Sequence, residues 1–194
     1  MRWLAIIFGL FFINSMNAQN DLVYKNLDDA LRAKEQGVTV LHIDLSKSKL
    51  SELPEEMLNF PNLMSLNLDK NKLKSLPLWM GGFQNLESLS ASKNKFKTFP
   101  EVILELKSLR TLKLGDNMIN GIPIDIDNLH KLESLWLWSN VIRTFPASLS
   151  EIESLKFIDL LYNNMTYEEQ TWLKELLQDV VIDLSEPCTC EFDD

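Results

Sequence analysis

A period of 23 residues runs through the chain from Val40 to Met165, and it limits the possible folds more than any other feature of the sequence. Counting positions from the start of each block, positions four, six and eleven are always apolar, position nine is Asn in blocks two to six, and position fifteen is Pro in blocks one to five. Such agreement between columns indicates a chain built by stacking copies of one small unit. The six blocks start at Val40, Leu63, Leu86, Leu109, Leu132 and Leu155.

A unit of this length is too short to bury its own apolar side chains, whereas stacked units bury one another's. The apolar side chains at positions four and six alternate with outward-facing ones at positions three and five, which predicts a short strand in every block. The Asn at position nine lies where the chain turns, and its amide can pair with backbone groups that a strand ladder leaves free. The Pro at position fifteen stops further pairing and turns the chain toward the outer side.

This pattern resembles the 23-residue class of the leucine-rich repeat family, with the motif LPxxLxxLxxLxxLxLxxNxLxx, in an exported, bacterial-type member. The resemblance covers residues 40–165 and implies an α/β fold: a curved, right-handed solenoid with a parallel sheet on its concave face. The chain departs from the motif at three points. Ser48 replaces the first Asn, Gly81 and Gly82 loosen the second outer segment, and Glu169 stands where the sixth block would have Pro.

The N-terminus has the layout of a secretory signal peptide over residues 1–18. One positive charge, Arg2, precedes an uncharged apolar run that ends at Ile13, and cleavage is expected after Ala18. The apolar run is too short to span a bilayer. We therefore expect an exported protein, either periplasmic, on the cell surface or secreted, with no stable membrane insertion.

Both ends of the repeat array are expected to carry caps, which shield the terminal cores of a solenoid. Residues 19–39 would form a helical N-terminal cap with Asn26 as its N-cap, and residues 40–165 the six repeats. Residues 166–194 would form a C-terminal cap helix and an acidic tail. The cap helix should begin with a capping box of Thr166 and Glu169 and bury Trp172 in the core. One further strand is expected after it.

Two tryptophans in the fifth block, Trp136 and Trp138, fall at outward-facing positions, because Leu135 and Leu137 fill the core positions beside them. Neighbouring strands lie about 4.8 Å apart. The tryptophans should therefore form one cluster on the concave face with Phe157, Leu161 and Tyr162 of the sixth block. Two charged residues flank Trp136 in its column and could orient a ligand or make a cation–π contact. The candidate ligand-binding residues are Lys113, Trp136, Trp138, Phe157, Asp159 and Tyr162.

An exposed aromatic patch of this size usually marks an interaction site, and Trp and Tyr are enriched at binding hot spots. Two other interpretations stay open at this point. The C-terminal tail could fold over the cluster, or the cluster could mediate self-association.

The charge of the chain is −9, with 28 acidic and 19 basic residues, which argues against nucleic acid or anionic lipid as a partner of the whole surface. Local charge differs, because eight lysines fall at positions eight, ten and twelve of the first three blocks. They could attract an anionic partner, although the simpler interpretation is a row of solvated charges. These residues are Lys47, Lys49, Lys70, Lys72, Lys74, Lys93, Lys95 and Lys97.

No motif in the sequence indicates catalysis. His42, Asp44, Ser65 and Ser88 share the concave face, but an open sheet offers no water-excluding pocket and no oxyanion donors. The sequence has no Gly-rich phosphate loop, no HExxH motif and no Cys and His set with metal-ligand spacing. We therefore expect a protein that is not an enzyme and holds no metal or cofactor.

The expected function is non-catalytic binding through the concave face. The family resemblance implies a protein as the partner. A carbohydrate, which would stack on the aromatic rings, and a self-associating secreted scaffold are the alternatives. The oligomeric state does not follow from the sequence.

Overall fold

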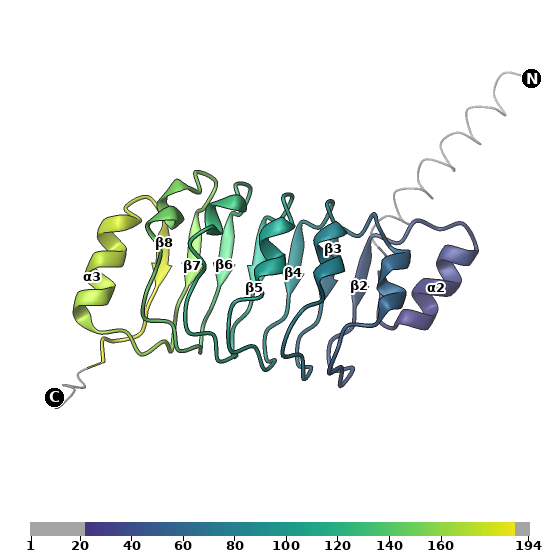
Figure 1. Cartoon of the computed structure of the whole chain (residues 1–194), viewed down its shortest axis with the longest axis horizontal. Coiled ribbons are helices and arrows are strands. Elements are labelled where there is room, and N and C mark those ends of the chain that lie inside the picture. Colours follow the sequence, from purple (N-terminus) through teal and green to yellow (C-terminus); the bar gives the residue numbers. More distant parts are fainter. Residues whose placement is uncertain (1–21, 189–194) are drawn as a thin grey trace, which may run out of the picture.

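The computed structural model describes residues 22–188. The predicted signal peptide, residues 1–18, and the end of the predicted acidic tail, residues 189–194, lie outside the described residues. Figure 1 shows one elongated array of repeats with a helix at either end.

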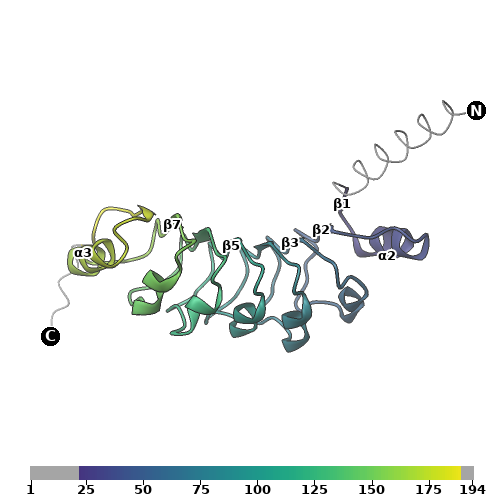
Figure 2. The same ribbon diagram turned by 90° about the horizontal axis from the view of Figure 1, so that it is seen from above.

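One parallel sheet of eight strands runs along the array in chain order. Equivalent positions of neighbouring repeats lie side by side, so that His42 pairs with Ser65 and Ser65 with Ser88. Seen along the strands, the sheet follows the inner side of an arc, which makes it the concave face (Figure 2). The strands are β1 (Val23–Tyr24), β2 (His42–Asp44), β3 (Ser65–Asn67), β4 (Ser88–Ser90), β5 (Thr111–Lys113), β6 (Ser134–Trp136), β7 (Phe157–Asp159) and β8 (Val181–Asp183).

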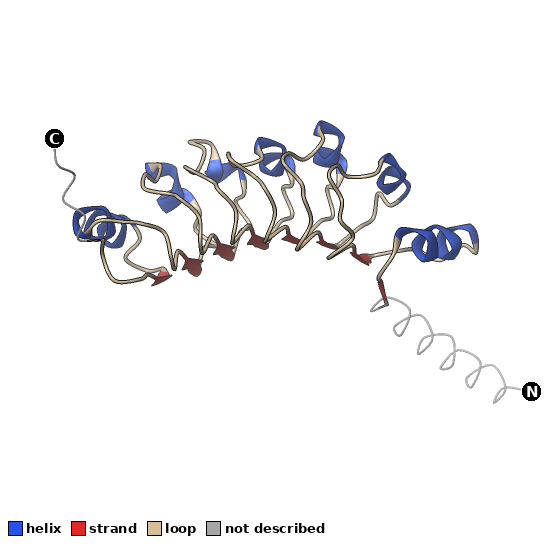
Figure 3. Cartoon of the chain, turned by 90° about the horizontal axis from the view of Figure 1, so that it is seen from below, coloured by secondary structure: helices blue, strands red, loops and turns tan. Residues whose placement is uncertain are grey.

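Short 3-10 helices occupy the outer side of the arc (Figure 3). Four of the five begin directly after the Pro of position fifteen, which has extended backbone and serves as the N-cap. The fourth begins later, after Asp125. The helices are η1 (Glu55–Asn59), η2 (Leu78–Gly82), η3 (Glu101–Glu105), η4 (Ile126–Asn128) and η5 (Ala147–Glu151).

The hydrophobic core lies between the sheet and the 3-10 helices. Positions four and six are buried in all six repeats, from Ile43 and Leu45 to Ile158 and Leu160. Positions three and five point to the concave surface and are half-buried in most strands. The predicted alternation of inward and outward side chains is therefore confirmed.

The Asn at position nine joins each repeat to the one before it. Asn140 is typical: its Oδ1 accepts a hydrogen bond from the Ile119 N–H at 2.9 Å, and its Nδ2 donates to Leu114 O at 3.1 Å and to Leu137 O at 2.9 Å. Four other asparagines make the same set of contacts: Asn71, Asn94, Asn117 and Asn163. The expected pairing of this amide with free backbone groups is thus confirmed.

At the N-terminal end, helix α2 (Leu27–Glu35) packs Ala30 and Ala33 against the first repeat. Its N-cap is Asn26, as expected, and the Asn26 Oδ1 accepts a hydrogen bond from the Asp29 N–H at 2.8 Å. The two-residue strand β1, which precedes the helix and extends the sheet, was not predicted.

At the C-terminal end, helix α3 (Tyr167–Leu176) begins with the predicted capping box of Thr166 and Glu169. The expected extra strand is β8, which pairs with β7. The prediction that Trp172 is a core residue is wrong, because its side chain is 44 % exposed. Gln170, Leu173 and Leu177 form the buried stripe of this end, and Trp172 lies beside that stripe, next to the fifth repeat.

Among residues 22–188, no helix has both the length and the apolar character needed to cross a lipid bilayer.

The asparagine contacts predict a large effect of Asn140→Ala on stability. The substitution leaves one N–H and two carbonyl groups without their partner, and an unpaired buried group costs about 1–3 kcal/mol. We expect the free energy of unfolding, measured by urea denaturation, to fall by about 3 kcal/mol.

Asn62→Ala is the matched control, because Asn62 is exposed and its side chain makes no hydrogen bond with the described part of the chain. It should change the free energy of unfolding by less than about 0.5 kcal/mol. Equal losses in the two variants would contradict a special role for position nine.

Candidate functional site

The concave face changes character along the array. Its outward positions carry small polar or charged side chains in the first four repeats, and aromatic side chains at Trp136, Trp138 and Phe157 in the last two. All three aromatic side chains are half-buried, which places them neither in the core nor fully in solvent. The contacts that hold these side chains in place therefore determine whether the surface can bind a ligand.

Trp136 lies between residues of the two neighbouring repeats. The Lys113 Nζ lies over its ring, 5.0 Å from the centroid. The Phe157 ring centroid is 4.8 Å away, with the two planes inclined at 53°. A cation over an aromatic face and a tilted ring pair are both favourable contacts. They fix the orientation of Trp136 before any ligand binds.

Trp138 packs onto Gly115 of the preceding repeat. A Cβ added at Gly115 would overlap the indole ring of Trp138. The Lys93 Nζ lies 5.6 Å from the Trp138 ring centroid. Among the described aromatic residues of the concave face, only Trp136 and Phe157 form a ring pair. Trp136 thus packs against Phe157, whereas Trp138 packs on Gly115.

Gly115 is the residue that sequence reasoning missed. It occupies position seven of the fourth repeat, where the other repeats carry Ser46, Asp69, Ser92, Trp138 and Leu161. The signal was present, since the only Gly in this column directly precedes the only Trp. Reading the column for side-chain size, as well as for polarity, would have found it.

The described C-terminal segment extends the concave sheet. Strand β8 places Val181 beside Phe157 and Asp183 beside Asp159, and Val181 is exposed there. Tyr162 is 71 % exposed and lies in the turn after β7, with a left-handed φ of 59°. It therefore stands at the end of the aromatic surface. The final residues, 189–194, lie outside the described part of the chain.

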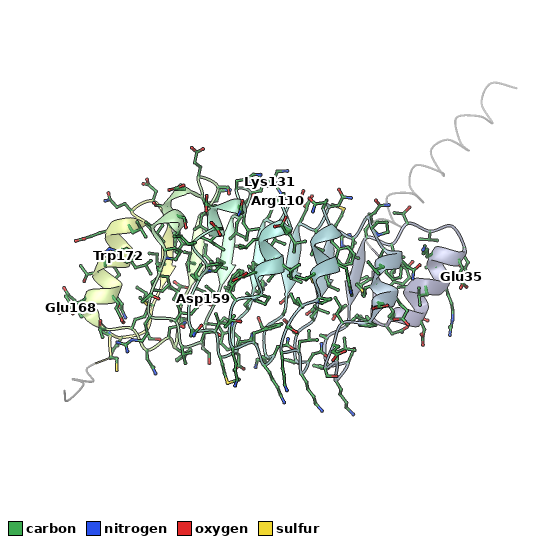
Figure 4. The ribbon with its side chains drawn as sticks, viewed as in Figure 1. Glu35, Arg110, Lys131, Asp159, Glu168 and Trp172 are labelled. Carbon is green, nitrogen blue, oxygen red and sulfur yellow. The ribbon has the colours of Figure 1, made fainter. Side chains whose placement is uncertain are left out.

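Asp159 is the candidate residue with the most unusual surroundings, and Figure 4 labels it on the sheet. Its side chain is 5 % exposed, between Trp136 and Asp183 in the ladder. Burial raises the pKa of the Asp159 carboxyl above the ordinary value, and the negative charge of Asp183 raises this pKa further. The hydrogen bond that the Leu161 N–H donates to Oδ1 at 3.0 Å lowers the pKa and so opposes the rise. Within residues 22–188, no Lys or Arg forms an ion pair with it.

The four polar residues of the concave face that resemble a hydrolase site, His42, Asp44, Ser65 and Ser88, make only one of the contacts that such a site needs. His42 Nδ1 and Ser65 Oγ are 2.8 Å apart. Asp44 instead accepts a hydrogen bond from the Ser46 N–H, and no hydrogen bond between Asp44 and His42 occurs in the described structure. No group of three or more His, Cys, Asp or Glu side chains among residues 22–188 is arranged to hold a metal ion.

Trp172 borders a second apolar surface, on the outer side of the array where α3 meets the fifth repeat. The groove has a volume of about 360 Å³, and the Arg143 Nε donates to the Glu169 Oε1 across it at 3.2 Å. Figure 4 labels Trp172 and Glu168 on α3. The lining residues are Arg143, Thr144, Phe145, Glu168, Glu169 and Trp172.

The contact between Trp138 and Gly115 predicts that Gly115→Ala displaces the indole. The new methyl group overlaps the ring, and such overpacking costs about 1–3 kcal/mol. We expect the Trp138 indole N–H resonance, assigned through its loss in Trp138→Phe, to shift in a ¹⁵N–¹H spectrum.

Gly82→Ala is the control, because a Cβ there meets nothing within 4 Å. An unchanged Trp138 resonance in Gly115→Ala would show that the indole does not rest on this glycine.

The raised pKa of Asp159 predicts a pH-dependent effect of Asp159→Asn. Because the folded-state pKa lies above the unfolded value, the stability from this group is full below the ordinary pKa of 3.8 and is lost as the pH rises through the raised pKa. Asn avoids this loss and keeps an oxygen acceptor, as Asn67 does for the Asp69 N–H.

The Asn variant should therefore be more stable than the parent at pH 7, and the difference should vanish below pH 3.8. Urea unfolding across this pH range measures it. A difference that does not vary with pH would exclude titration of Asp159 as the cause.

Comparison with known families and structures agrees with the architecture. The family model described as "Leucine rich repeat" matches residues 39–96. No curated protein sequence matches the chain.

Three solved structures share the fold. The leucine-rich repeat ectodomain of the Arabidopsis thaliana receptor kinase GASSHO1/SCHENGEN3, in complex with CASPARIAN STRIP INTEGRITY FACTOR 2, is 26 % identical over 77 % of this chain, with a TM-score of 0.62. A chain of the Drosophila Toll–Spatzle complex is 28 % identical over 72 %, with a TM-score of 0.60. An internalin from Listeria monocytogenes is 18 % identical over 79 %, with a TM-score of 0.59.

This chain matches only part of each of these proteins, 18 %, 19 % and 50 % of their respective lengths. The period of 23 residues, the eight-stranded parallel sheet, the family match and these neighbours lead to one conclusion. The chain folds as a leucine-rich repeat solenoid, and its residues 39–96 match the model of that family.

Proposed function

We propose that this chain is a non-catalytic binding protein whose concave face takes a protein partner, with Trp136 and Trp138 as the anchors of the contact. The observation that carries the proposal is the preorganised aromatic surface. Trp136 is held by Lys113 and Phe157, and Trp138 rests on Gly115.

Preorganisation matters because ordering a mobile side chain weakens binding by about 0.5–1.5 kcal/mol. Half-buried tryptophans that are already oriented avoid much of this loss. They still retain exposed surface that a partner can bury, and tryptophans in such positions are frequent hot spots.

The comparisons support a protein as the ligand. The Arabidopsis structure holds a receptor ectodomain with CASPARIAN STRIP INTEGRITY FACTOR 2, and the Drosophila structure holds Toll with Spatzle. A carbohydrate is less suited to this surface. Lys113 and Lys93 already lie over the tryptophan rings, so a sugar stacking on those faces would have to displace a lysine.

The charges at the C-terminal end of the face suggest the chemistry of the partner. Asp159 and Asp183 lie side by side in the ladder. A Lys or Arg of the partner beside Asp159 would relieve the repulsion between the two carboxylates. The proposed ligand surface is therefore apolar, to cover Trp136 and Phe157, with a basic residue at one side.

We also propose that the protein acts after export, with residues 1–18 removed. Within the described residues, residues 22–39 would then serve as part of the N-terminal cap, residues 40–165 as six repeats, and residues 166–188 as part of the C-terminal cap.

The proposal predicts that Trp136→Ser/Trp138→Ser loses the partner. Affinity capture with mass spectrometry, using the chain from Gln19 as bait, identifies the partner, and titration calorimetry then measures its affinity. Each buried tryptophan contributes on the order of 2 kcal/mol, so we expect the double variant to bind on the order of 1,000-fold more weakly.

Trp172→Ser is the matched control, since Trp172 is an exposed tryptophan on the outer side. It should capture the same partner with the parent's affinity. Circular dichroism checks that each variant is folded. If the folded double variant keeps its partner and Trp172→Ser loses it, the binding surface is the outer groove and the proposal fails.

A further inference from the structure

The loops that follow the strands form one continuous edge of the solenoid, which we call the loop edge: positions eight, ten and twelve of the six repeats. Position-eight N–H groups donate to the next repeat, as from Lys70 to Ser92 O at 2.9 Å. Position-ten N–H groups donate to the preceding repeat, as from Lys95 to Leu73 O at 2.8 Å. These bonds hold the loops in register as a stiff row.

The loop edge lies along the lower margin of the molecule in Figure 1. Figure 4 shows that the strands run from the upper to the lower margin. Arg110, just before β5, lies near the upper margin, and Glu168, which follows the last loop, lies at the lower left.

The first half of the loop edge is strongly basic. All eight lysines named above are exposed. Among the described residues, only Lys93 of this set forms an ion pair, with Asp116 at 3.8 Å. The same loops carry two carboxylates, Glu52 and Asp69, and Asp69 is engaged by the Ser90 hydroxyl and the Ser92 N–H, both at 2.7 Å. A positive row therefore stands uncompensated on an acidic protein.

Some of these lysines occupy a backbone conformation that lysine does not favour. Position eight is left-handed in every repeat, and four lysines have φ near +60°: Lys47, Lys49, Lys70 and Lys93. Gly and Asn adopt this conformation more readily than Lys. The backbone conformation therefore does not explain why lysine occurs at these positions. We attribute its occurrence to the charge of the side chain.

The second half of the same edge carries three large apolar or aromatic side chains among polar ones, which include Asp116, Ser139 and Arg143. Position ten, which is Lys49, Lys72 and Lys95 in the first repeats, becomes Met118 and Val141. Met118 is 47 % exposed and Val141 50 %. Tyr162 follows at position eight of the sixth repeat. One continuous edge thus joins a lysine row to exposed apolar side chains.

We propose that the loop edge docks the solenoid onto an anionic lipid bilayer. Clusters of four to eight lysines bind anionic headgroups, while apolar and aromatic side chains beside them enter the headgroup boundary. A soluble polyanion would use only the lysines, which leaves the exposed Met118, Val141 and Tyr162 unexplained. With six repeats about 4.8 Å apart, the edge presents a row roughly 24 Å long.

This orientation leaves the concave face free. The sheet would stand upright on the membrane, so that Trp136 and Trp138 remain open to a protein partner at the side. The local lysine row would thereby overcome the acidity that argues against anionic lipid for the surface as a whole.

Sedimentation with lipid vesicles tests the proposal, using the chain from Gln19. The vesicles are phosphatidylcholine alone or with about 30 % phosphatidylglycerol. We expect binding to the anionic vesicles only, weakening as salt is added. Lys72→Ser/Lys95→Ser/Lys97→Ser should weaken it about 100-fold, since each lysine contributes about fivefold.

Lys131→Ser/Lys156→Ser/Lys174→Ser is the control with the same change in charge. Lys131 and Lys156 precede strands at the opposite edge, Lys174 lies on α3, and this variant should lose less than about threefold. Met118→Ser/Val141→Ser should weaken binding about tenfold at constant salt. Trp136→Ser/Trp138→Ser should bind vesicles like the parent, which separates this test from that of the protein partner.

Three results would overturn the proposal. The parent could fail to bind anionic vesicles, or the two triple-lysine variants could bind them equally. The third is binding to immobilised heparin that depends on Lys72, Lys95 and Lys97 while vesicle binding does not. That outcome would identify a soluble polyanion as the ligand.

Discussion

The buried asparagine at position nine is the interaction on which the rest of the structure depends. Its amide joins three backbone groups from two adjacent repeats, at the point where the chain leaves the sheet. Because this junction recurs every 23 residues, each column of the sequence becomes a continuous row along the arc of the molecule. Positions three, five and seven line the concave face, and positions eight, ten and twelve line the loop edge.

Periodic contacts explain why so much of the fold could be predicted from the sequence. The strands, the inward leucines and the capping box at Thr166 follow from rules that apply to one repeat or one helix turn. The candidate site was predictable in part, for the same reason: columns placed Trp136 beside Lys113 and Asp159. The packing of Trp138 onto Gly115 was missed, because the period marks which positions face outward and does not measure the space that a missing side chain leaves beside them.

Trp172 shows a second limit. Helical spacing placed Trp172 next to Leu173 in the core, but a rotation of one residue moves a side chain from the buried stripe to its border. Only the neighbouring repeat decides on which side of that border the side chain lies. The error arises where the order of the repeats gives way to the order of a helix.

The pairing of Trp138 with Gly115 has a consequence for how such a protein can diversify. Solenoid genes change readily by duplication or loss of whole repeats, since each repeat contacts only its neighbours. A repeat inserted between the fourth and fifth would leave every backbone junction intact and yet set a new residue beneath the indole. The fourth and fifth repeats must therefore stay adjacent for this surface to be kept. Insertion or loss of a repeat should be tolerated more easily at the other boundaries of the array.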